Sequence, residues 1–80
     1  MKFAVKIFWM QNGRLKLLLE PEALDVPSVE NAREIAEGFA ALAPAHSISI
    51  ESEDGLISER WFWLNGEWTR HERDRSERVG

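Results

Sequence analysis

The chain contains no cysteine, no tyrosine and only three prolines in its 80 residues. Without cysteine there are no disulfides, no cysteine-ligated zinc and no thiol catalysis, and a reducing, cytoplasmic location is expected. No apolar run approaches the ~18 residues that a membrane span needs. The first residues alternate lysine with apolar side chains, and no signal peptide is expected there. The sequence predicts a small cytoplasmic protein without a membrane partner.

Motifs for catalysis are also missing. There is no glycine-rich phosphate loop, and the serines near His46 do not stand in the strand–turn–helix context of a nucleophile. His71, Glu72 and Asp74 carry groups that can ligate a metal, but their arginine-rich surroundings do not supply a closed four-ligand set. We predict a non-catalytic protein that needs neither a cofactor nor a metal.

The length of the chain suits one domain. At this size only about 60% of the unfolded chain's surface becomes buried, so the core is small. Four tryptophans and four phenylalanines are a large aromatic content for it, and most of them are expected to be structural. Residues 1–69 are expected to form a single α+β domain. Residues 70–80 are expected to be a flexible tail of mixed charge.

Alternating apolar residues predict a hairpin at the N-terminus. The alternation runs through Phe3, Val5, Ile7 and Trp9 and resumes at Leu15, Leu17 and Leu19. A two-residue turn at Asn12-Gly13 would set Met10 opposite Leu15 and split this apolar set between two faces. A three-residue loop would set Trp9 opposite Leu15 and keep the set on one face. We predict the three-residue loop for that reason.

A helix follows the connector between Pro21 and Pro27. Ser28 is a good N-cap and Glu30 stands in the first turn, where the helix dipole favours an anion, so the helix is expected from about Val29 to Leu42. Its expected apolar stripe consists of Ala32, Ile35, Ala36, Phe39, Leu42 and Ala43. Gly38 costs about 1 kcal/mol relative to alanine inside a helix. Close packing of the helix on a sheet is the expected reason for it.

Two further hairpins are predicted after the helix. Turns at Asp54-Gly55 and Asn65-Gly66 would pair Ser52 with Ile57, Ile48 with Trp61 and Trp63 with Trp68. One face would then gather Ile48, Ile50, Ile57, Trp61 and Trp63. The resulting ββαβββ order predicts an α+β two-layer sandwich, in which one helix packs on one face of an antiparallel sheet.

Charge is distributed unevenly along the sequence. The first nineteen residues hold four basic residues and no acid, whereas the segment from Glu20 to Glu67 holds eleven carboxylates against Arg33 and Arg60. Glu30, Glu34 and Glu37 recur at helical spacing, so they should line one side of the helix. Such a surface is typical of a solvated, soluble domain, and it also suits a positively charged partner.

The general plan resembles that of a known class of proteins. A cysteine-free chain of about eighty residues, with a hairpin–helix–hairpin order and carboxylates on its outer helix face and turns, resembles the small inhibitors carried by phages and mobile elements, in particular the anti-CRISPR proteins. The resemblance implies an acidic protein that occupies the positively charged channel where a CRISPR surveillance complex grips DNA. The partner-binding residues would be Glu30, Glu34, Glu37, Glu51, Glu53, Asp54 and Glu59.

Two other functions stay open at this point. A self-associating structural domain would pair two copies, as a possible homodimer, through the uncovered sheet face, with Phe8, Met10, Phe62 and Leu64 between them. A weak single-stranded nucleic-acid binder would use the basic face expected for the first hairpin. That face would consist of Lys2, Lys6, Phe8, Arg14 and Lys16.

Overall fold

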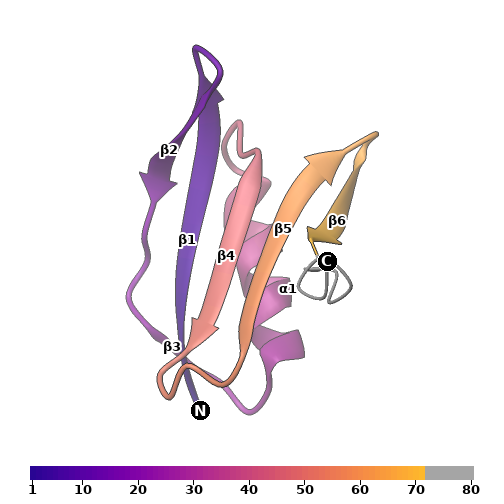
Figure 1. Ribbon diagram of the computed structural model, residues 1–80. Helices are drawn as coiled ribbons and strands as arrows, with labels where there is room; N and C mark the ends of the chain where they lie inside the picture. Colours follow the sequence, from indigo (N-terminus) through magenta and orange to yellow (C-terminus); the bar gives the residue numbers. More distant parts are fainter. Residues whose placement is uncertain (72–80) are drawn as a thin grey trace, which may run out of the picture.

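The computed structural model describes residues 1–71 of the chain. In this part the elements follow the order β1 (Lys2–Gln11), β2 (Arg14–Leu19), β3 (Leu24–Asp25), α1 (Val29–Ala40), β4 (Ser47–Ser52), β5 (Ser58–Leu64) and β6 (Glu67–His71). All strand pairs are antiparallel, and the helix lies behind the sheet in Figure 1, leaving the other face open. The predicted α+β two-layer fold is confirmed, with the short strand β3 as an addition.

Strand β1 connects the two halves of the sheet. The strands lie in the order β2-β1-β4-β5-β6, and β3 pairs with the N-terminal end of β1 (Figure 1). The C-terminal ends of β1 and β5 extend beyond β4, where β1 pairs with β2 and β5 pairs with β6, and the N–H of Trp63 donates to the carbonyl of His46 at 3.0 Å. The result is a flat slab with extents of 39 × 34 × 20 Å.

The core lies between α1 and the two central strands. Its fully or almost fully buried side chains are Phe3, Val5, Ile7, Ala32, Ala36, Ala40, Ile48 and Ile50. The alternation in β1 and β4 places these strand residues on one face, as the period of two requires. On α1 the buried positions are alanines four residues apart, which lets the helix axis approach the sheet closely.

The start of α1 is as predicted, but its buried stripe is different. The side chain of Ser28 accepts a hydrogen bond from the backbone N–H of Asn31 at 3.3 Å, so the N-cap is confirmed. The helix ends at Ala40, two residues early, and leaves Leu42 85% exposed. Ile35 is also exposed, because the narrow alanine ridge turns this position to the side of the helix.

The first hairpin has the register that the sequence analysis rejected. Asn12 and Gly13 have φ angles of 53° and 78°, as a two-residue type I′ turn requires, and Met10 lies opposite Leu15. The predicted three-residue loop is wrong, because the twist of the type I′ turn suits a hairpin and a bulge resolves the apolar conflict. Leu18 has no partner on β1, and beyond it Ile7 lies opposite Leu19. Leu18 packs against the core instead.

The two later hairpins have the predicted registers. The pair of Ile48 with Trp61 and the pair of Trp63 with Trp68 are both present. Strand β6 continues through Arg70 and His71, so these two residues belong to the sheet and not to the predicted tail. The remaining residues assigned to the tail, 72–80, and with them Glu72 and Asp74, lie outside the described residues.

Candidate functional site

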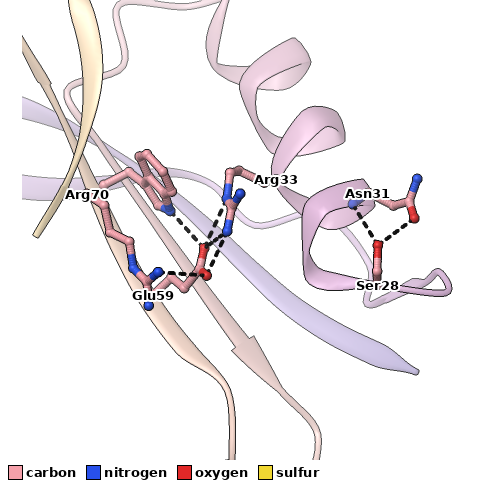
Figure 2. A network of polar contacts seen from close by, with 6 residues as sticks. Ser28, Asn31, Arg33, Glu59 and Arg70 are labelled. Atoms are coloured by element: carbon pink, nitrogen blue, oxygen red, sulfur yellow. Dashed lines mark hydrogen bonds and ion pairs between the residues drawn. The ribbon is translucent and has the colours of Figure 1, made fainter. Parts of the chain in front are cut away.

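One buried carboxylate joins the helix to the sheet. Glu59 lies opposite Ile50, on the face of β5 that α1 covers, and its side chain is only 4% exposed. The guanidinium of Arg33 donates to it from Nη2 at 2.8 Å and 3.0 Å and from Nε at 3.2 Å (Figure 2). The indole of Trp61 donates a further hydrogen bond at 3.0 Å, and Arg70 Nη1 lies 3.7 Å from Oε2.

These partners keep Glu59 ionised. Burial by itself raises the pKa of this carboxyl, but the hydrogen bonds from Arg33 and Trp61, with the charges of Arg33 and Arg70, outweigh burial and lower the pKa. The hydrogen bond to Glu59 in turn raises the pKa of Arg33. The guanidinium of Arg33 also lies 4.8 Å from the centre of the Trp61 ring, a cation–π contact. Glu59 is therefore a structural residue and not part of an exposed acidic surface.

The other predicted acidic residues lie on different sides of the molecule. Glu30 and Glu34 are exposed on α1, and Glu37 is half-buried there. Glu51 pairs with Ala4 and Ser58, which places it on the open sheet face, opposite the helix. The structure brings the helical carboxylates together, and the sheet separates them from Glu51.

The remaining two acids stand in the turn between β4 and β5. Asp54 Oδ1 accepts hydrogen bonds from the hydroxyl of Ser52 at 2.6 Å and from the N–H of Leu56 at 3.0 Å, and these bonds lower the pKa of Asp54. The carboxylate of Asp54 therefore stabilises the turn. The side chain of Glu53 is exposed, while its backbone N–H donates to the carbonyl of Lys2 at 2.9 Å.

The predicted basic face of the first hairpin does not form. In the two-residue register Lys16 lies opposite Trp9 and Arg14 opposite Gln11, on the helix side of the sheet. Lys2 and Lys6 belong to the open face, where Lys6 Nζ lies 3.8 Å from a Glu20 carboxylate oxygen. The four basic residues are thus divided between two faces, and the prediction that they share one is wrong.

The open sheet face carries an apolar patch. The predicted self-association residues all lie there, and the corrected register adds two leucines that the sequence analysis had placed toward the core. We call this set the open-face patch: Phe8, Met10, Leu15, Leu17, Phe62 and Leu64. Met10, Leu17 and Leu64 are 44%, 51% and 47% exposed, and apolar side chains grouped in this way mark interaction surfaces.

Polar side chains are built into the same face. Ser47 stands between Phe8 and Phe62 in neighbouring strands, is fully buried and donates to the carbonyl of Trp61 at 3.0 Å. The guanidinium of Arg60 lies 5.6 Å from the centre of the Phe8 ring. Phe62 and His71 contact each other edge to face with ring centres 5.9 Å apart. Both aromatic rings of the patch are therefore already ordered.

Two hollows lie away from this patch. One of about 440 Å³ is lined by the start of β1 and the turn after β4, including Lys2, Glu53 and Asp54. Another of about 400 Å³ lies on the helix side, between the end of α1 and the β5–β6 hairpin, and includes Trp63 and Trp68. Within residues 1–71 no group of three or more histidine, aspartate or glutamate side chains is placed to hold a metal ion.

No protein-family model, no curated protein and no solved structure matches this chain. The part of the chain that the structure describes has no helix with the length and apolar character to cross a membrane.

Proposed function

We propose that this protein is a non-catalytic, self-associating domain that binds a second copy through its open sheet face. The observation that carries the proposal is the open-face patch. Six apolar side chains lie on a sheet face that no other described segment covers, four on the β1–β2 hairpin and two on β5, on either side of Ser47. A two-layer α+β slab buries only one side of its sheet, so covering the other side with a second sheet about 10 Å away completes a sandwich.

The size of the open sheet face and the rigidity of its aromatic side chains favour a second copy of the chain as the partner. The broad side of the slab extends over 39 × 34 Å, which is more area than the roughly 800 Å² that each partner of a stable dimer buries. Phe8 and Phe62 are held by Arg60 and His71, so little side-chain freedom is lost when they are covered.

Charge complementarity favours a two-fold arrangement. Arg60 and His71 form one cross-strand pair, and Leu64 and Glu67 form another four residues further along β5. A two-fold axis along the row of Phe8, Ser47 and Phe62 would place the first pair of one copy opposite the second pair of the other. Arg60 and His71 of each copy would then lie near Glu67 of its partner.

Sedimentation equilibrium over a range of concentrations tests this proposal. We expect a dimer for the natural chain and a monomer for Phe62→Asp, which buries a charge in the interface. Leu42→Asp is the matched control, because Leu42 is 85% exposed and lies outside the patch. Arg60→Glu and Glu67→Arg should each weaken the dimer, and combining them should restore it in part. A monomer at millimolar concentration, or a dimer unchanged by Phe62→Asp, overturns the proposal.

A second candidate is an acidic inhibitor of the anti-CRISPR kind, which blocks a basic, nucleic-acid-binding surface of a larger protein complex. One observation favours it: Arg33 is turned inward to Glu59, which leaves the three helical carboxylates Glu30, Glu34 and Glu37 without an ion-pair partner among residues 1–71. Affinity for such a complex should fall as salt rises. Replacing all three by lysine should abolish capture of the complex from a bacterial lysate, and capture that is unchanged rules this function out.

A further inference from the structure

The helix side of the sheet contains a row of tryptophans that α1 covers only in part. Trp61 and Trp63 stand two residues apart on the same face of β5, and Trp68 lies opposite Trp63 on β6. Trp61 is covered by Arg33. Trp63 lies beyond the reach of the helix and is 44% exposed.

The hollow beside this row is lined by small apolar and aromatic side chains. Its walls are the four alanines and Pro44 of the segment 40–45 together with Trp63 and Trp68, and its volume is about 400 Å³. We call it the tryptophan hollow. The two indole rings stand 69° apart with centres separated by 5.2 Å, so they form two walls of a corner.

The electrostatics of the tryptophan hollow favour a cation. Indole rings attract cations at their faces, and the helix end that lines the hollow carries the negative end of the helix dipole. The last turn of α1 contains no basic residue to neutralise this end, and it contains Glu37. Along the same row Arg33 already lies over Trp61. At the end of α1 the residues that line the hollow are alanines. Their side chains are too short to lie over an indole ring as Arg33 does, so the space beside the ring stays open.

The hydrogen-bonding groups that line the tryptophan hollow limit which kind of cation can bind there. The alanine, proline and tryptophan side chains of the walls accept no hydrogen bond, and of the carbonyls in this segment those of Ala40 and Ala43 already accept bonds within the turn that ends the helix. An ammonium or guanidinium group would lose water without finding a side-chain acceptor for its N–H groups on these walls. A quaternary ammonium carries charge but no N–H group, so it avoids this cost.

We infer that the tryptophan hollow binds a small quaternary ammonium compound of the choline type. The hollow lies on the helix side of the sheet, away from the open-face patch, so this inference does not depend on self-association. The volume of the hollow is within the range of small-molecule sites, which are mostly apolar with few polar contacts.

The test is a titration followed by NMR of the tryptophan indole N–H groups, with the full chain. Choline should shift the Trp63 and Trp68 resonances in a saturable way and leave that of Trp9 unchanged. The uncharged isostere 3,3-dimethylbutan-1-ol should bind about tenfold more weakly, because it lacks the cation–π attraction. Equal binding of the two compounds would show that charge is not recognised and would overturn the inference, as would the absence of any shift.

Two variants keep this test specific to the hollow. Trp63→Leu removes one aromatic wall and should abolish choline binding, while Trp9→Leu should not. Ala41→Leu fills the hollow without removing an aromatic ring, and Ala41 has φ −67° and ψ −19°, which leucine adopts readily. It should therefore also abolish binding. If Ala41→Leu binds choline as the natural chain does, the site is not this hollow.

Discussion

Arg33 on α1 and Glu59 on β5 form the one ion pair that joins the helix to the sheet among residues 1–71. Both oxygens of the Glu59 carboxylate accept hydrogen bonds from the guanidinium, at 2.8 Å and 3.0 Å from Nη2. The contact fixes the helix against β5, beyond the apolar core that β1 and β4 supply.

Breaking this pair should destabilise the fold. Arg33→Met leaves a buried carboxylate with Arg70 as its remaining cation, and we expect a loss of about 2–3 kcal/mol in the free energy of unfolding, below the upper range for fully buried pairs because Arg33 is 25% exposed. Adding Glu59→Leu to Arg33→Met should recover part of that loss, because no charge is then left buried. Urea denaturation of the two single variants and the double variant measures the coupling. If the double variant lost as much stability as the two single variants together, the two residues would not be coupled and this prediction would be contradicted.

The same pair should make stability depend on pH at the acid end. The pKa of Glu59 is lower in the folded protein than the ordinary value of 4.5, so its stabilisation is complete above about that pH and is lost as pH falls through the folded pKa. Thermal melts between pH 7 and pH 3 should show a smaller drop for Glu59→Gln than for the natural chain. Glu34→Gln, at an exposed position, is the control and should follow the natural curve.

Leucine substitutions in β2 test the register of the first hairpin. Leu18 packs against the core, whereas Leu17 is 51% exposed on the open face. We expect Leu18→Ala to cost about 2 kcal/mol and Leu17→Ala to change the stability of the monomer by less than about 0.5 kcal/mol. Chemical denaturation at concentrations where the chain is monomeric measures both. The three-residue loop would give the reverse order.

Replacing Gly38 by alanine should stabilise the protein. Apart from its two chain neighbours and the backbone of its own helix, no described atom lies within 4 Å of the position that a Cβ would take, so the expected close packing at Gly38 is wrong and the glycine only weakens the helix. A gain of about 0.5–1 kcal/mol is expected. Gly66→Ala serves as the contrasting variant and should destabilise, because Gly66 has a φ of 81°. A rise in melting temperature for both variants would contradict this account.

Local signals in the sequence were enough to predict the two later hairpins and the start of the helix. Asp54-Gly55 and Asn65-Gly66 are strong turn signals, and in both cases the turn and the apolar alternation favoured the same register. The N-cap Ser28 was predicted correctly, because its residue type and Glu30 in the first turn favoured the same start of the helix. At the first hairpin the two signals disagreed. The turn determined the register, and the bulge at Leu18 restored part of the apolar alternation. A bulge of this kind cannot be read from a pattern of period two.

The role of Glu59 could have been found from the same alternation. It stands between Ile57 and Trp61 at positions two apart, so the predicted register already placed it on the helix-facing side. A carboxylate there requires a cation, and Arg33 is the only one on the helix. The tryptophan hollow had no such signal, because it depends on where α1 ends relative to Trp63.

The central position of β1 has a consequence for biosynthesis. Of the described strands it is translated first, yet its partner β4 begins only at Ser47, and the hairpin with β2 covers only its far end. Phe3, Val5 and Ile7 therefore remain uncovered until α1 has been translated, and they lack their neighbouring strand until β4 follows, some forty residues after Ile7. Closing the core means bringing together strands that are distant in sequence, and a pairing of this kind makes folding slow. Until α1 and β4 have both been made, the nascent chain exposes side chains that will later be its most buried.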